Sequence, residues 1–278
     1  MGNMTIGLCC RDVPGLSLEA QFEQAKRLGF DRVQIALWRM EHLNEESANE
    51  TNMLLRKYGL ICTEIWCGWQ KPAMWDFKYG PSNLGLVPAE YRAIRTQNLL
   101  DGAAYARVLG VSDVITHLGF IPVNPLDPDY TGLIIALKHI TAEYAKYEQF
   151  FSFETGQEPP VVVKRCIEDV GAQNMGVNYD PANLMIYGNA NALDGLQLLG
   201  PYVRSVHAKD GTYPTGGYLL GEETVLGEGD VQIAEFIERL KELGYSGTLS
   251  IEHERKNLTL ERKEEEILIA KKLLESLL

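Results

Sequence analysis

The stretch Phe151-Ser-Phe-Glu-Thr-Gly156 joins an apolar run, an ionisable side chain and a turn signal. Aromatic and small residues followed by glycine are typical of a short buried strand. Glu154 lies at the carboxyl end of this strand, where an ionised carboxylate is costly unless a cation pairs with it. The stretch therefore predicts a strand that ends in a charged functional site.

Three later strand-like runs have the same arrangement, with a side chain of the kind that binds metal ions at or near the end of an apolar segment. These runs and side chains are 176–180 with Asp180, 203–210 with His207, and 248–254 with Glu252. The intervals from Glu154 to Asp180 and from Asp180 to His207 each fit one strand followed by one helix. We therefore expect successive strands to deliver these side chains to one place.

The whole chain alternates strand-like runs with helical runs. The expected strands are 5–10, 32–38, 61–67, 113–119, 151–156, 176–180, 203–210 and 248–254. The expected helices are 16–28, 47–58, 88–109, 130–149, 159–170, 193–199, 231–243 and 258–278. Repeated strand-then-helix units without a composition shift predict one α/β domain over residues 1–278, a closed (β/α)8 TIM barrel. A doubly wound open sheet is the alternative, but the first strand lacks the glycine-rich turn typical of that fold.

The composition excludes several classes of protein. The formal net charge of −12 disfavours binding to nucleic acid or to an anionic membrane surface. No apolar run approaches the roughly 18 residues of a membrane span, and the first residues lack the basic and apolar regions of a signal peptide. The five cysteines form no CxxC motif, which is typical of reduced thiols in a chain of this length. We therefore expect a cytoplasmic protein without nucleic-acid or membrane partners.

In a (β/α)8 barrel the catalytic groups lie where the strands end and the loops to the helices begin. Glu154, Asp180, His207 and Glu252 all fall at or near such ends. Each alone has an ordinary structural explanation, as a salt-bridge partner, a turn former or a core imidazole. Together, three carboxylates and one imidazole predict a site for one divalent ion, with Mn²⁺ as our first choice and Mg²⁺, Co²⁺ and Zn²⁺ as alternatives.

Five segments carry a resemblance to a known family. They are Ser152-Phe-Glu-Thr-Gly156, Asn178-Tyr-Asp-Pro-Ala-Asn-Leu184, Val206-His-Ala-Lys-Asp210, Leu226-Gly-Glu-Gly-Asp230 and Ser250-Ile-Glu252. This set resembles the xylose isomerase-like TIM-barrel superfamily, in its sugar-phosphate isomerase/epimerase group and its ketose 3-epimerases. The resemblance implies that Glu154, Asp180, His207 and Glu252 bind one divalent metal ion, and that the two glutamates exchange a proton with a sugar carbon.

Two positions depart from the ketose epimerases. Asn183 stands three residues after Asp180, where those enzymes usually have a histidine. The segment after His207 contains Lys209 but no nearby arginine. These departures leave the contacts to sugar hydroxyls or to a phosphate open, and Asn183 and Lys209 are our predicted substrate contacts there.

The chemistry of this residue set favours proton transfer next to a carbonyl. Such a carbon loses its proton only where the enediolate is stabilised, and a metal ion bridging neighbouring sugar oxygens supplies this stabilisation. Glu154 and Glu252 come from separated strands, so one can remove the proton and the other return it on the opposite face. We therefore expect an isomerase or epimerase of a small sugar, keto-sugar or polyol.

Three alternatives stay open. One is a lyase of the same family, acting by keto-inositol dehydration or by β-elimination from a 3-keto-glycoside. Another is the repair-endonuclease branch, whose three zinc ions require many more histidines than the five present, and which the charge of −12 also disfavours. The last is a non-catalytic scaffold subunit.

Other polar and aromatic residues are candidates for the wall of the site. His117, at the end of the run 113–119, is a candidate catalytic base or sugar contact, and Glu64 and Trp66 are candidate substrate contacts. A tryptophan ring suits the C–H face of a sugar, although core packing is its commoner role. The aromatic segment 68–87 is a candidate lid or subunit contact. From the family resemblance we also expect a homo-oligomer, a dimer or a tetramer.

Overall fold

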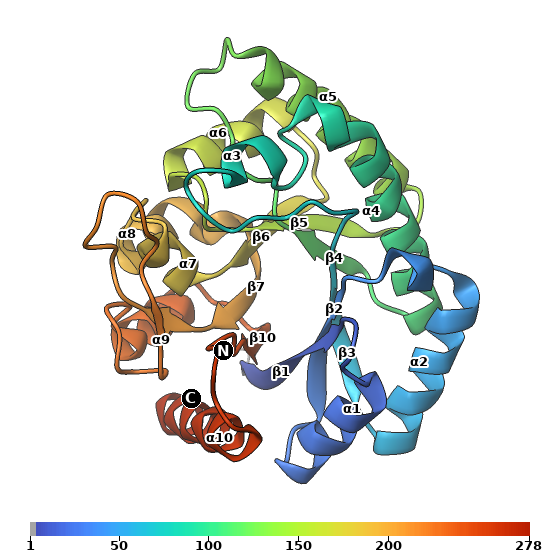
Figure 1. Ribbon diagram of the computed structural model, residues 1–278, viewed down its shortest axis with the longest axis vertical. Helices are drawn as coiled ribbons and strands as arrows, with labels where there is room; N and C mark the ends of the chain where they lie inside the picture. Colours follow the sequence, from blue (N-terminus) through green and yellow to red (C-terminus); the bar gives the residue numbers. More distant parts are fainter. Residues whose placement is uncertain (1–3) are drawn as a thin grey trace.

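The computed structural model describes residues 4–278. Parallel strands close into a barrel in the order β1-β10-β7-β6-β5-β4-β3-β2, which confirms the predicted (β/α)8 fold (Figure 1). The barrel strands are β1 (Thr5–Asp12), β2 (Arg32–Leu37), β3 (Ile61–Cys67), β4 (Asp113–Thr116), β5 (Phe150–Glu154), β6 (Met175–Tyr179), β7 (Val203–Ala208) and β10 (Thr248–Ile251). The short strands β8 (Asp210–Gly211) and β9 (Glu223–Thr224) form a separate antiparallel pair after β7.

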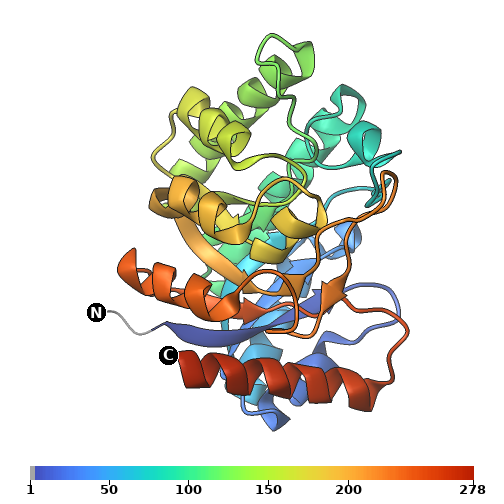
Figure 2. The same cartoon turned by 90° about the vertical axis from the view of Figure 1, so that its left-hand side faces the viewer.

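Helices surround the barrel, and in Figure 2 α10 runs alongside β1, so that β1 begins and α10 ends on the same side. The helices are α1 (Leu18–Arg27), α2 (Glu45–Tyr58), α3 (Gly80–Asn83), α4 (Ala89–Leu109), α5 (Pro128–Ala145), α6 (Pro160–Val170), α7 (Pro181–Ile186), α8 (Ala192–Leu199), α9 (Ile233–Glu242) and α10 (Leu260–Leu277), with single 3-10 turns at Met40–His42 and Gly200–Tyr202. None of the helices within residues 4–278 is long and apolar enough to cross a membrane.

The helix boundaries follow local hydrogen-bond chemistry. Asn44 caps α2, since its side-chain oxygen accepts from the backbone N–H of Ser47 at 2.9 Å. Gly59 ends the same helix at φ 61°, a left-handed conformation that glycine adopts without strain. The sequence suggests Asp230 as the cap of α9, and this prediction is wrong. The residue before α9 is Gln232, and the Asp230 carboxylate instead accepts from the backbone of Tyr213 at 3.2 Å.

Alternation along the strands gives the barrel a polar lining. On β5, Phe151 and Phe153 join the apolar core beneath the helices, so Ser152 and Glu154 face the barrel interior. The same alternation turns a set of buried polar side chains inward from the neighbouring strands: Gln34, Glu64, Asn178, Ser205, His207 and Ser250. Polar groups in such an interior need partners, and they position the site at the strand ends.

The segment 68–87 crosses the strand ends and is fixed to α4. Arg95 of α4 is fully buried and donates hydrogen bonds to the carbonyls of Asn83 (2.8 Å), Gly85 (2.6 Å) and Pro72 (2.6 Å), with a longer one to Gln70 (3.3 Å). A side chain at Gly85 would overlap the backbone of Leu118, since the segment approaches the end of β4 closely. The predicted lid is therefore anchored at several points along its length.

Candidate functional site

Four side chains from four strand ends converge at one end of the barrel. Glu154 is the last residue of β5, Asp180 follows β6, His207 lies in β7 and Glu252 follows β10. Each offers one ligand atom, and these atoms all lie within 4.8 Å of one another. Asp180 also caps α7, because its Oδ1 accepts from the backbone N–H of Asn183 at 2.8 Å, which leaves Oδ2 to face the cluster.

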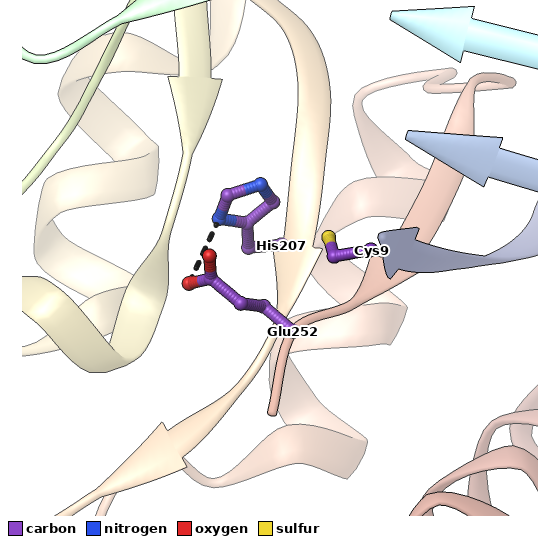
Figure 3. A group of neighbouring side chains, drawn as sticks. All are labelled: Cys9, His207 and Glu252. Atoms are coloured by element: carbon purple, nitrogen blue, oxygen red, sulfur yellow. Dashed lines mark ion pairs between the residues drawn. The ribbon is translucent and has the colours of Figure 1, made fainter. Parts of the chain in front are cut away.

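The Nδ1 atom of His207 lies at the centre of the cluster. It is 3.2 Å from Glu154 Oε1, 3.3 Å from Asp180 Oδ2 and 3.4 Å from Glu252 Oε2. Figure 3 shows this ring nitrogen joined to Glu252 by the dashed line. The other ring nitrogen, Nε2, lies 2.8 Å from Gln34 Oε1. Nδ1 is therefore the nitrogen that would face an ion.

Opposite charges dominate the electrostatics of the cluster. Burial alone would raise the pKa of Glu154, but His117 and His207 outweigh it and hold the pKa well below its usual range. Burial likewise opposes the ionised form of Glu252, yet Lys209 and His207 lower its pKa. Asp180 differs, because burial outweighs Lys209 and raises its pKa. The pKa of His207 is raised well above its usual range, since Glu154 and Glu252 overcome the opposing effect of burial.

The donor set fits a divalent cation. Three carboxylates face one imidazole, and carboxylate oxygens with an imidazole nitrogen are the usual ligands of Mn²⁺, Co²⁺ and Zn²⁺ and, for the oxygens, of Mg²⁺. Glu154, Asp180, His207 and Glu252 would hold such an ion. A second group of potential ligands, Cys9 with His207 and Glu252, overlaps it. The four-residue group is the better site, because it offers four ligand atoms where the group with Cys9 offers three.

Lys209 and Asn183, the predicted substrate contacts, both touch the predicted ligands. Lys209 Nζ donates to Glu252 Oε2 (2.9 Å), Glu254 Oε2 (2.7 Å) and Asn183 Oδ1 (3.2 Å). Asn183 Nδ2 donates to Glu154 Oε1 at 2.8 Å. Burial would lower the pKa of Lys209, but the surrounding carboxylates raise it well above its usual range. The site therefore contains a fixed ammonium beside the carboxylates.

An aromatic wall adjoins Glu154. Trp66 Nε1 donates a hydrogen bond to Glu154 Oε2, and His117 Nε2 lies 3.4 Å from Glu154 Oε1. The Trp75 ring lies 5.0 Å from His117 and 6.0 Å from Trp69. Trp38 lies 5.0 Å from Trp66, so all four tryptophans of the chain gather here. Trp66 and His117 therefore both contact Glu154, and their roles as substrate contact and as catalytic base stay predictions.

Glu64 lies apart from the cluster. It precedes Trp66 by two residues on the inward face of β3, which places it roughly 7 Å further down the barrel. Its carboxylate accepts from the Thr63 hydroxyl at 2.5 Å. Burial raises its pKa to about 7. The structure therefore does not bring Glu64 to the four ligand residues, and a substrate contact stays a prediction.

Residues 22–277 match the family described as xylose isomerase-like TIM barrel. The chain belongs to this family. Uncharacterized protein MJ1311 of Methanocaldococcus jannaschii is 29% identical over 190 residues, which cover 64% of this chain and 62% of that protein's length. The solved xylose isomerase domain protein from Planctomyces limnophilus is 30% identical over 99% of this chain and 97% of its own, with a TM-score of 0.92.

Other solved members of the fold are enzymes of more than one reaction class. D-psicose 3-epimerase from Clostridium cellulolyticum H10 is 13% identical, with a TM-score of 0.71 and 99% of both chains covered. The probable 3-DHS dehydratase AsbF from Bacillus anthracis is 18% identical, with a TM-score of 0.70, covering 98% of this chain and 99% of its own. At these identities the likeness shows the fold alone.

In this member of the family, the sequence patterns do not identify two buried polar residues near the site, Gln34 and Glu158. Gln34 stands between the core residues Val33 and Ile35, so alternation on β2 was the signal that could have found it. Glu158 is buried in the loop before α6, and neither of its carboxylate oxygens has a hydrogen-bond partner within residues 4–278. Burial raises the pKa of Glu158 well above its usual range, and the negative charge of Glu154 adds a smaller increase. A protonated Glu158 would offer a hydrogen-bond donor beside the site.

Proposed function

We propose that this family member is a divalent-metal-dependent isomerase or epimerase of a small sugar or keto-sugar. The observation that carries the proposal is the placement of three carboxylates within 3.4 Å of the single atom His207 Nδ1. An ion held by these residues would act as a Lewis acid toward the carbonyl of a sugar and lower the cost of removing the neighbouring proton. Mn²⁺ is our first choice.

Glu252 is the better candidate for the base. Both oxygens of Glu154 accept hydrogen bonds, from Trp66 and Asn183, and its side chain is 2% exposed. Glu252 accepts from Lys209 at Oε2, whereas its Oε1 accepts no hydrogen bond from residues 4–278 and faces the Arg11 guanidinium in a longer ion pair of 3.6 Å; its side chain is 13% exposed. A base needs a free oxygen that can reach the proton. We therefore assign proton removal to Glu252 and proton return on the opposite face to Glu154.

A lyase is the second candidate, and the surroundings of His117 support it. His117 is buried beside Glu154, and its Nδ1 has no hydrogen-bond partner in the described part of the chain. When this nitrogen carries a proton, it can give it to a leaving hydroxyl, which departs as water, while Glu252 takes the proton from the neighbouring carbon. The probable dehydratase with the same fold adds weight to this candidate.

Two measurements test the proposal and separate the candidates. Metal analysis of the purified protein should find one divalent ion per chain, and Glu252→Gln should weaken its retention. A panel of sugars and keto-sugars with added Mn²⁺ should yield a product by NMR in deuterated buffer. An isomerase or epimerase exchanges the carbon-bound proton and keeps every oxygen, whereas a lyase loses a group. No ion and no turnover would support a scaffold subunit instead.

The expected partners are also proposals. We propose a sugar or polyol as the small-molecule substrate, and a homodimer or homotetramer as the assembly. Light scattering after size-exclusion chromatography gives the mass of the assembly. A monomeric mass over a wide range of protein concentration would contradict the homo-oligomer.

A further inference from the structure

Gln34 occupies a position inside the barrel that its packing alone does not explain. It is 1% exposed, and its neighbours on β2, Val33 and Ile35, belong to the apolar core on the outer side. Burying an amide costs free energy unless its polar atoms are hydrogen-bonded. An aliphatic side chain of the same length would avoid this cost, so the amide needs a reason that lies in its contacts.

Two groups that can donate a hydrogen bond converge on the amide oxygen of Gln34. His207 Nε2 lies 2.8 Å from Oε1, and Cys9 Sγ lies 3.6 Å from the same atom. A thiol is a weak S–H donor, and the geometry directs that of Cys9 at this oxygen. In Figure 3, Cys9 lies on the side of the imidazole ring away from the nitrogen that faces Glu252. An amide oxygen can only accept hydrogen bonds, so a ring nitrogen that faces it is hydrogen-bonded only when it carries a proton.

We propose that Gln34 is a positioning residue that selects the nitrogen by which His207 binds the ion. A neutral imidazole carries its proton on either nitrogen, and the hydrogen bond to one of them decides which. An acceptor 2.8 Å from Nε2 keeps the proton there. An imidazole that binds an ion is neutral, so in that state the lone pair is on Nδ1, which faces Glu154, Asp180 and Glu252. This inference rests on the metal site in the proposed function and adds to it the residue that orients its only nitrogen ligand.

Variants of Gln34 can separate this role from simple filling of the interior. Gln34→Met keeps an unbranched chain of similar length but removes the acceptor, and Gln34→Glu keeps an acceptor in the same place. Ser152→Ala is the matched control. Ser152 also faces the barrel interior, is fully buried and makes no side-chain hydrogen bond with residues 4–278. If Gln34 only fills space in the barrel, Gln34→Met should bind the ion as tightly as Gln34→Glu does.

The experiment uses the full chain loaded with Zn²⁺, which is diamagnetic and suits NMR. Long-range ¹H–¹⁵N spectra of ¹⁵N-histidine-labelled protein distinguish a protonated ring nitrogen from a metal-bound one, and His207→Asn assigns the His207 signals. In the wild type, Nε2 should be protonated and Nδ1 should respond to Zn²⁺. Competition with a chelating dye gives the Zn²⁺ affinity, which Gln34→Met should lower by about 10- to 100-fold, as loss of the partner of a metal-binding histidine typically does. Gln34→Glu and Ser152→Ala should retain wild-type affinity within a few fold.

The outcomes distinguish the inference from the function on which it rests. Wild-type affinity in Gln34→Met, together with an unchanged nitrogen pattern, would overturn the positioning role and leave the metal site intact. A wild-type protein whose His207 signals do not respond to Zn²⁺ would overturn both. If Gln34→Met does not fold, Gln34→Leu replaces it with the same expectation. If both fail to fold while Gln34→Glu folds and binds normally, the need for an acceptor is supported.

Discussion

Lys209→Met is expected to destabilise the metal-free protein and, at the same time, to strengthen its binding of a divalent ion. Lys209 is buried, and its ammonium lies 2.9 Å from Glu252, 2.7 Å from Glu254 and 3.8 Å from Asp180. Without a cation, the carboxylates at the strand ends repel one another, and Lys209 offsets part of this repulsion. Removing it leaves His207 as the cation that Glu252 and Asp180 share, with Arg11 at 3.6 Å from Glu252, so part of the buried negative charge is no longer compensated.

The structure sets the size of the effect. Breaking a buried ion pair by deleting one partner costs about 3 to 5 kcal/mol. We expect a cost at the lower end of this range. The Glu254 side chain is 44% exposed and lies 2.8 Å from Arg11, so without Lys209 its carboxylate still has an ion-pair partner and contact with water. A bound divalent ion supplies positive charge to Glu252 and Asp180, so the cost in the loaded protein should fall by about 2 kcal/mol, which corresponds to roughly 30-fold tighter binding of the ion.

Urea unfolding measures the loss of stability in Lys209→Met, once with a chelator for the metal-free protein and once with saturating Mg²⁺ for the loaded protein. Titration calorimetry measures the affinity for Mg²⁺. Lys164→Met is the control, because Lys164 makes an exposed pair with Glu168 at 2.8 Å on α6. Such a pair contributes less than about 1 kcal/mol, with or without the ion. Equal destabilisation of Lys209→Met in both conditions, or weaker binding of the ion, would refute the reasoning. Lys209 would then not be compensating the charge of the predicted ligands.

Three further predictions address the interior, the anchored segment and the aromatic wall. Burial raises the pKa of Glu64 from 4.5 to about 7, so its carboxyl ionises at a lower pH in the unfolded chain than in the folded one. The free energy of unfolding should therefore fall as the pH rises from about 4.5 to about 7. Relative to the wild type, Glu64→Gln should raise the free energy of unfolding in urea by roughly 3 kcal/mol at pH 8 and by little at pH 5. An equal increase at both pH values would contradict the raised pKa of Glu64. Arg95→Met should cost about 3 to 5 kcal/mol and speed hydrogen exchange in 68–87 more than in α10, because four carbonyls lose their donor. A sugar that is turned over should change the intrinsic fluorescence, since the Trp75 ring lies 5.0 Å from His117, and the change should shrink in Trp75→Leu. Turnover with unchanged fluorescence would show that the aromatic wall does not contact the substrate.

The strand-end side chains were predictable because each is an ionisable residue at or near the end of an apolar segment. Glu154 is an ionisable group at the end of an apolar strand, and repeated spacing of such groups by one strand–helix unit fixes them to one end of a barrel. Alternation also predicts what lies outside the site. His253 follows Glu252 and therefore points away, and its Nε2 lies 2.7 Å from Glu266 of α10. These inferences need only the period of a strand and the direction of the chain.

Other features depend on contacts between distant segments and leave no local signal. Arg95 lies in the middle of a long helix, and nothing in its neighbourhood of the sequence shows that it holds the carbonyls of Pro72 and Gly85. Glu158 follows a turn in which charged residues are ordinary, and only burial in the fold makes it unusual. The expected strand 203–210 ends instead at Ala208, because Asp210 leaves the barrel and pairs with Thr224 of β9.

The two departures from the ketose-epimerase pattern form one structural unit. An ammonium can only donate a hydrogen bond and an ionised carboxylate can only accept one. The amide of Asn183 meets both requirements at once, since its oxygen accepts from Lys209 at 3.2 Å and its nitrogen donates to Glu154 at 2.8 Å. Its orientation is therefore fixed from both sides, and it couples the ammonium near Glu252 to the carboxylate of Glu154. The second N–H and the second lone pair of the Asn183 amide are left for a substrate, and the bonds to Lys209 and Glu154 set the directions in which they point. Asn183 and Lys209 therefore have to be considered together when the preferred sugar is sought.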